Sequence, residues 1–281
     1  MIVDCRKLAS EVDETTRSVI SGSEQAGARP RVVEIIATDH QSVVSYSATK
    51  AKKAASLGIA YSPRTYDKSV IAAQILKDIR EMNADETVHG VMVGLPLFAH
   101  LDEETVTNEV RHQKDIDGLG AFNTYFVANN REDAGLAPAT ARAAIHILES
   151  LGAISGKRAV VVGRGPTVGR PLAQMLINRD ATVSIAHSRT RELERLVRET
   201  EIVVSATGRR GLIDPAWISS GQTVIDCGIS FVDGKTVGDV DSAAIDARGG
   251  IVTSVPGGVG VVTNAMLFSN LVKALRLQQV S

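Results

Sequence analysis

Residues 157–171 read KRAVVVGRGPTVGRP, and this stretch decides the fold of the second half of the chain. Its β-branched run predicts a buried strand that leads through Gly163, Gly165 and Gly169 into a helix. Glycines let a backbone approach a pyrophosphate, and a helix N-terminus presents free N–H groups to it. The GxGxxxG spacing also fits a tight turn without a ligand, but its place between strand and helix favours a dinucleotide-binding loop.

Strand-like and helix-like stretches alternate on both sides of this loop, which indicates an α/β fold with parallel sheets. From about residue 142 onward the order is that of a Rossmann-type domain. The strands expected there are 157–165, 181–188, 201–208, 222–229 and 249–256. In the first half we expect strands at 31–38, 58–66 and 88–97, and helices at 42–58 and 69–83.

The bulk composition narrows the class of protein. With 281 residues and 44% hydrophobic content, two domains are expected. A net charge of -1 argues against a nucleic-acid partner. We expect no membrane partner, since no apolar run approaches the ~20 residues of a membrane span. We expect a cytoplasmic location, since the N-terminus lacks an apolar signal core and Cys5 and Cys227 form no CxxC motif. The two cysteines and six histidines have no metal-ligand spacing, so no metal site is expected.

The end of the strand at 181–188 bears on the choice of cofactor. An acidic residue there would bind the ribose 2′-hydroxyl of NAD. The sequence instead has His187-Ser188-Arg189-Thr190, and Arg164 lies in the glycine loop. Guanidinium groups suit a 2′-phosphate, so NADP is preferred over NAD, although Arg189 could also simply start a solvated helix.

A second stretch, residues 46–59, reads YSATKAKKAASLGI. In a helix, Tyr46 and Lys50 stand one turn apart on the same face. Two interpretations are open at this point. The stretch is either a solvated, lysine-rich surface helix or the carrier of an acid/base pair that faces a pocket.

Several segments together resemble one family, the methylenetetrahydrofolate dehydrogenase/cyclohydrolase (FolD-type) folate enzymes. The order and spacing of these segments match over essentially the whole chain, with the departures of a divergent member. The segments are YSATKAKKAASLGI, VHGVMVGLPLFAHLDE (88–103), KDIDGLGAFN (114–123), VVVGRGPTVGRP (160–171), HSRT (187–190) and SVPGGVGVVTNAML (254–267).

The resemblance implies two α/β domains flanking a cleft. Residues 1–141 with 263–281 would form a folate-binding catalytic domain, and residues 142–262 an NADP-binding Rossmann domain. The implied activity is oxidation of 5,10-methylene-tetrahydrofolate with a nicotinamide cofactor, then hydrolysis of the methenyl product to 10-formyl-tetrahydrofolate. A tetrahydrofolate derivative as substrate and a homodimer are expected with it.

The resemblance also implies roles for individual residues. Lys50 would be the catalytic lysine with Tyr46 as its partner, and Asp117 the carboxylate that binds the pterin; a turn residue before a glycine is the plain alternative for Asp117. Other substrate-binding residues would be Leu95, Pro96, Pro256, Gly257 and Gly258. The cofactor-binding residues would be Gly163, Arg164, Gly165, Thr167, Val168, Gly169, Ser188, Arg189, Thr207 and Ile229.

The chain also departs from the family pattern. Gly94 stands where the family has a glutamine before Leu-Pro-Leu, Val43 where it has a serine, and Phe98 and Val261 where it has prolines. Loss of an amide beside Lys50, with no evident replacement, predicts impaired hydrolysis and preserved hydride transfer, and Gly94→Gln is expected to restore some hydrolysis. A related dehydrogenase on another pterin or one-carbon carrier, or a non-catalytic folate- and NADP-binding paralogue, are the alternatives.

Overall fold

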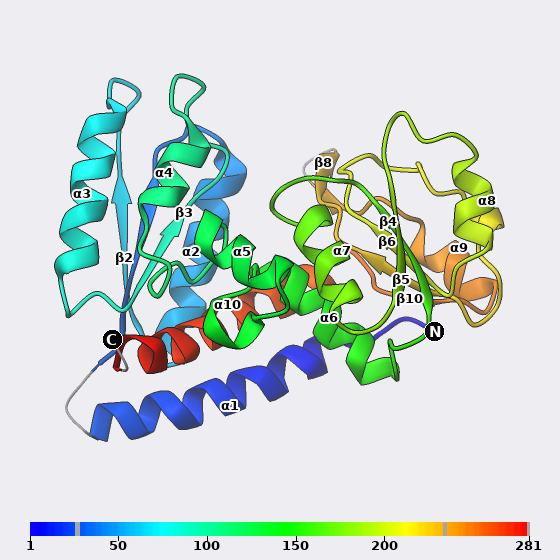
Figure 1. Cartoon of the computed structure of the whole chain (residues 1–281), viewed down its shortest axis with the longest axis horizontal. Helices are drawn as coiled ribbons and strands as arrows, with labels where there is room; N and C mark the ends of the chain where they lie inside the picture. The colour runs from blue at the N-terminus through cyan, green and yellow to red at the C-terminus, as the bar shows by residue number, and fades with distance from the viewer. Residues whose placement is uncertain (26–28, 233–234, 280–281) are drawn as a thin grey trace. The chain divides into compact units, whose positions relative to one another are not determined.

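The computed structural model describes residues 1–25, 29–232 and 235–279, and these form two compact units (Figure 1). The catalytic unit, as we name it, comprises Glu11–Ala139 with Leu267–Ser281. The nucleotide unit comprises Met1–Ser10 with Thr140–Met266. Each unit is built on its own parallel sheet, which confirms the predicted fold class of two α/β domains.

The N-terminus lies elsewhere than expected, because Met1–Ser10 belongs to the nucleotide unit and not to the catalytic one. The cause is backbone pairing: Val3 N donates to Val252 O at 2.9 Å, and Ile2 forms a parallel bridge with Val252. The chain also passes from one unit to the other after Ala139 and after Met266.

The catalytic unit has a three-stranded sheet in the order β2-β1-β3. Its strands are β1 (Arg31–Ile36), β2 (Ala60–Thr65) and β3 (Gly90–Val93). Its helices are α2 (Gln41–Ser56), α3 (Ala72–Ala84), α4 (Glu103–Glu109) and α5 (Ala121–Ala128), a 3-10 turn spans Glu132–Ala134, and α1 (Cys5–Gln25) and α10 (Val259–Gln279) each supply residues to both units.

Alternation along β1 sorts its side chains onto two faces of the sheet, as the two-residue period of a strand requires. Val33 and Ile35 belong to a core with Ile75 and Ile79 of α3. Val32 belongs to a second core, which also holds residues of α2 and α10. Glu34 lies between Val33 and Ile35 in the strand, so its carboxylate points to the face that α2 covers.

The nucleotide unit has a five-stranded parallel sheet in the order β10-β7-β6-β4-β5. The order reverses at β4, whose carboxyl end is therefore the point where ligands bind in such sheets. The strands are β4 (Arg158–Val162), β5 (Thr182–Ala186), β6 (Ile202–Ser205), β7 (Thr223–Asp226) and β10 (Ile251–Val252), with a small antiparallel pair of β8 (Ser230–Val232) and β9 (Lys235–Val237). The helices are α6 (Ala139–Leu151), α7 (Gly169–Ile177), α8 (Leu193–Arg198) and α9 (Ser242–Ala247), and a 3-10 turn spans Pro215–Trp217.

Candidate active site

Lys50 is buried in the catalytic unit, where α2 packs on the sheet. Its side chain forms an ion pair with Glu34 of β1, and the two residues are 6% and 0% exposed. A buried charge is tolerated when it is paired and hydrogen-bonded. For Lys50, therefore, the surface-helix interpretation of residues 46–59 is wrong.

The second oxygen of Glu34 is also occupied. The hydroxyl of Tyr61, on β2, donates to Glu34 Oε2, and Tyr61 in turn lies 2.9 Å from Ser47 Oγ. Ser47 is buried on α2, three residues before Lys50. The four side chains form one connected polar network, which we call the Glu34 network: Lys50, Glu34, Tyr61 and Ser47.

Tyr46 stands over the outer side of Lys50. The lysine Nζ lies 5.1 Å from the centre of the Tyr46 ring, within the range of a cation–π contact. Burial, and then the carboxylates of Asp117 and Glu34, raise the pKa of the Tyr46 hydroxyl, which keeps it protonated and able to donate. Because the residue is still 38% exposed, its ring can also contact a ligand.

Asp117 contributes a free carboxylate to the same region. Burial raises its pKa to about 6, Lys50 acts in the lowering direction, and Asp115 and Glu34 act in the raising direction. Among the described residues, none donates a hydrogen bond to this carboxylate. Its acceptor capacity is thus available to a ligand.

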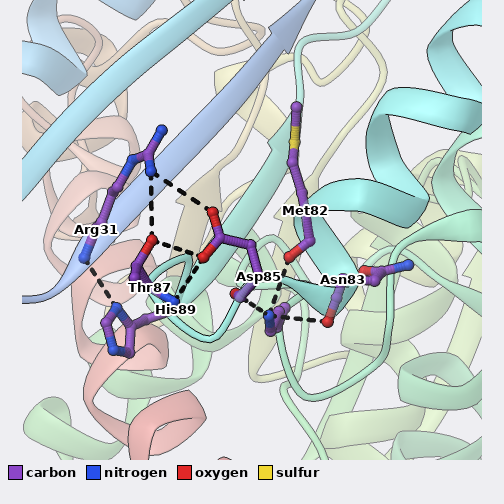
Figure 2. A network of polar contacts seen from close by, with 7 residues as sticks. Arg31, Met82, Asn83, Asp85, Thr87 and His89 are labelled. Carbon is purple, nitrogen blue, oxygen red and sulfur yellow. Dashed lines mark hydrogen bonds and ion pairs between the residues drawn. The ribbon is translucent and has the colours of Figure 1, made fainter.

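Lys114 anchors the loop that carries Asp117. Its Nζ donates to the carbonyl oxygens of Met82 and Asn83, each at 3.0 Å, and of Asp85 at 2.8 Å. These carbonyls lie at the end of α3, where a cation also complements the helix dipole (Figure 2). Lys114 is therefore a structural residue.

Asp115 fixes the other side of this loop. Its carboxylate accepts hydrogen bonds from Gly118 N at 3.0 Å, Gly120 N at 2.8 Å and Asn123 Nδ2 at 2.9 Å. Of the two acids in the KDIDG segment, only Asp117 is left for a ligand. The plain turn-residue interpretation fits Asp115 better than Asp117.

The space beside Gly94 is filled, contrary to the expectation that nothing replaces the missing glutamine. A Cβ atom on Gly94 would lie 2.9 Å from Val43 Cγ1 and 3.7 Å from Glu34 Oε1. The Glu34 carboxylate thus supplies a polar partner for Lys50 next to this position. The nearby Phe98 cannot do so, since it packs in the core with Ile35.

The two other predicted residues of this segment lie just after β3. Leu95 packs against the core that includes Ile35, and Pro96 is exposed. Leu95 therefore stabilises the hydrophobic core of the catalytic unit, whereas Pro96 is accessible to a ligand.

The three glycines of the cofactor loop meet different requirements in the nucleotide unit. Gly163 has φ +123°, and a Cβ there would overlap Ala206 O. A Cβ on Gly169, at the start of α7, would overlap Gly163 O. Gly165 has no atom within 4 Å of its Cβ position, so its exposed backbone can be approached by a ligand. This pattern fits a bound pyrophosphate.

The remaining predicted cofactor residues differ in their availability. Arg164, Thr167, Ser188 and Arg189 are exposed, Val168 is half-buried, and Ile229 is exposed. Thr207 is already engaged: its N–H and hydroxyl donate to Asp239 Oδ2 at 2.9 and 2.8 Å. It therefore holds the turn after β6, and its hydroxyl proton is not free for the cofactor.

The Pro-Gly-Gly turn before α10 also lies in the nucleotide unit. Pro256 is exposed, and Gly257 has φ +93°, a backbone conformation that favours glycine. A Cβ on Gly258 would overlap Ser254 O. Glycine is required at both positions by the turn itself.

Comparison with known proteins agrees with this geometry. The family model described as tetrahydrofolate dehydrogenase/cyclohydrolase, catalytic domain, matches residues 3–117, and the NAD(P)-binding domain of the same family matches residues 138–279. The chain belongs to the tetrahydrofolate dehydrogenase/cyclohydrolase family. The predicted resemblance is thus confirmed.

Relatives in this family match over their whole length. The bifunctional protein FolD of Thermotoga maritima is 40% identical, over 99% of this chain and 100% of that protein. The crystal structure of the bifunctional FolD of Campylobacter jejuni superimposes with a TM-score of 0.95 at 30% identity, over 99% of both chains. The Trypanosoma brucei FolD, solved with NADP cofactor and an inhibitor, gives 0.94 at 32% identity, over 100% of this chain and 99% of that one.

Sequence reasoning missed Glu34, Tyr61 and Ser47. One signal was present, because Glu34 is the single acid in the apolar strand segment RVVEII. An acid inside a buried strand needs a cationic or donor partner, and the lysines of the next helix were the candidates.

Proposed function

We propose that this chain oxidises 5,10-methylene-tetrahydrofolate to the methenyl form with NADP and hydrolyses the methenyl product to 10-formyl-tetrahydrofolate. The observation that carries the proposal is the group formed by Lys50, Tyr46 and Asp117. A buried lysine, an aromatic ring over it and an unused carboxylate lie together in the unit that matches the family's catalytic domain.

These three residues have separate tasks in the proposed reaction. The Asp117 carboxylate accepts two hydrogen bonds from the 2-aminopyrimidine edge of the pterin. Tyr46 stacks on the flat part of the folate and bounds the site above Lys50. Lys50 exchanges a proton with the folate or with water during hydrolysis. NADP, when bound, supplies the hydride acceptor.

The cofactor preference rests on the end of β5. No acidic side chain stands in the four residues directly after this strand, 187–190, and the exposed Ser188 and Arg189 can bind a 2′-phosphate. The glycine loop at the end of β4 would hold the pyrophosphate, since no atom lies within 4 Å of the Gly165 Cβ position. NADP complexed with the Trypanosoma brucei relative supports the same choice.

A spectroscopic assay tests the function. Purified protein is incubated with 5,10-methylene-tetrahydrofolate and either NADP or NAD, and the reduced cofactor and the methenyl absorbance are followed separately. We expect NADP-dependent oxidation, with hydrolysis of added methenyl-tetrahydrofolate above the uncatalysed rate. Cofactor binding without oxidation would favour a non-catalytic folate- and NADP-binding paralogue. Turnover of another pterin alone would favour a related dehydrogenase with a different substrate.

We also propose a cytoplasmic homodimer. Ile185 is 45% exposed on β5, the edge strand of the nucleotide sheet, which supports self-association there. Both cysteines are free thiols, as expected in a reducing compartment. Among the described helices none has the length and apolarity to cross a bilayer. Light scattering coupled to gel filtration measures the oligomeric state, and cell fractionation the location.

A further inference from the structure

We infer that Glu34 is a positioning residue for Lys50 and that the hydrolysis depends on it, whereas the hydride transfer does not. This inference rests on the proposed function. It assigns a role in the site to a carboxylate that is not part of the family pattern described above. Its basis is the Glu34 network, defined by Lys50, Glu34, Tyr61 and Ser47.

The network determines where the Lys50 nitrogen can be. Glu34 is completely buried on the central strand, and its side chain reaches Lys50 with one oxygen and Tyr61 with the other. Tyr61 is itself held by Ser47 at 2.9 Å, so the carboxylate is fixed from both sides. A lysine side chain has many rotamers, and this contact selects one that keeps Nζ under the Tyr46 ring.

Gly94 and Glu34 are close neighbours in this tightly packed region. A Cβ atom at Gly94 would lie 2.9 Å from Val43 Cγ1 and 3.3 Å from Ile35 O, which is too close, and 3.7 Å from Glu34 Oε1, which is ordinary contact. A glutamine at Gly94 therefore cannot simply be added to the present site. It requires that Val43 give way, and it would place the amide next to the Glu34 carboxylate.

The two reaction steps place different demands on the lysine. In the hydrolysis, water adds to the methenyl carbon, and the bond from that carbon to N5 breaks with its electron pair left on N5. One of the two water protons goes to N5 and the other is released, and the carbon keeps the oxygen as the formyl group on N10. The group that exchanges a proton with this water or with N5 must stand at a fixed distance from it, and such a positioned acid or base contributes about 10²–10⁴-fold. Oxidation moves a hydride from the methylene carbon to the nicotinamide, and it requires alignment of these two carbons and no proton transfer to Lys50.

The test compares both activities in single variants. Glu34→Gln keeps the size of the side chain but replaces the charged acceptor by an amide. We expect the hydrolysis of methenyl-tetrahydrofolate to fall about 100-fold and its pH profile to move, while methylene-tetrahydrofolate oxidation stays within about threefold. Tyr61→Phe, which removes one hydrogen bond to the carboxylate, should give a smaller change in the same direction.

A second series tests the dependence between Gly94 and Glu34. Gly94→Gln alone should lower hydrolysis and thermal stability. In the background of Glu34→Val and Val43→Ala, the same Gly94→Gln change should raise hydrolysis. Lys77→Ala, an exposed residue of α3, serves as a matched control that changes neither activity.

The outcomes separate this inference from the proposed function. Parallel loss of both activities in Glu34→Gln with an unmoved pH profile would show a purely structural role and overturn the inference. Unchanged hydrolysis in that variant would overturn it as well. If the unmodified protein oxidises its substrate but does not hydrolyse methenyl-tetrahydrofolate, both the inference and the hydrolytic half of the function are wrong, and the dehydrogenase half stands.

Discussion

The affinity for tetrahydrofolate should depend on pH through Asp117. Burial raises the pKa of this carboxyl to about 6 in the free protein, and only the ionised form can accept both hydrogen bonds from the pterin. The ionised fraction therefore grows as the pH rises through 6. One pH unit below the pKa roughly one carboxyl in ten is ionised, so the affinity at pH 5 should be about tenfold lower than at pH 7.5.

Two variants give the size of the same interaction independently. Asp117→Ala removes the acceptor and should cost on the order of 2–3 kcal/mol of binding free energy, the amount typical of hydrogen bonds to a charged group. Asp117→Asn keeps the shape but has no group that titrates, so its weaker binding should not change through the Asp117 range. The difference between wild type and Asp117→Asn isolates this carboxyl from ionisation of the folate itself.

The measurement is calorimetric titration of anaerobic tetrahydrofolate between pH 5 and 8, with NADP titrated as a control. NADP affinity should survive both variants, because the glycine loop lies in the other unit. Wild-type affinity that matches the pH dependence of Asp117→Asn would contradict the reasoning. So would an Asp117→Ala variant that binds tetrahydrofolate as tightly as the wild type.

Three further predictions concern other parts of the molecule. Arg189→Ala should weaken NADP binding at least tenfold and NAD binding little, measured by titration of each cofactor; equal losses would exclude contact with a 2′-phosphate. Lys114→Met should lower the free energy of unfolding by about 1–3 kcal/mol in denaturant titrations, because three carbonyl oxygens lose their shared donor and one of them, that of Met82, is buried; a loss below about 0.5 kcal/mol would exclude the anchoring role. Gly163→Ala should destabilise the nucleotide unit, whereas Gly165→Ala should fold normally and weaken cofactor binding. Thermal melts with and without NADP distinguish the two effects, and equal melting temperatures of the two variants without NADP would contradict this prediction.

The fold was accessible from the sequence because its signals are local. The β-branched run before Gly163 and the apolar run around Val33 each predict a strand that the structure contains. The roles of the two acids in the KDIDG segment were harder to predict. The sequence pattern alone does not distinguish Asp115, which is hydrogen-bonded within the loop, from Asp117, which is free. That distinction depends on Asn123 and on two backbone N–H groups, which the fold brings in from residues later in the chain.

The Glu34 network was inaccessible for a related reason. Its members come from β1, α2 and β2, and only the pairing of these elements places Tyr61 near Glu34. In the sequence, the absence of a glutamine at position 94 has no visible compensation. The compensating carboxylate is visible only when the side chains on the α2 face of the sheet are seen together.

The proximity of Gly94 and Glu34 beside one lysine also constrains how such a site can evolve. A large amide at position 94 needs a smaller residue than Val43 beside it, and losing the amide before the carboxylate is gained leaves the lysine without a partner. Passage between the two arrangements therefore runs through a less active or less stable intermediate, and the effect of either substitution depends on the other. Considered alone, Gly94 is the loss of a polar partner for Lys50. Considered together with Glu34, it is the replacement of an amide partner by a carboxylate partner.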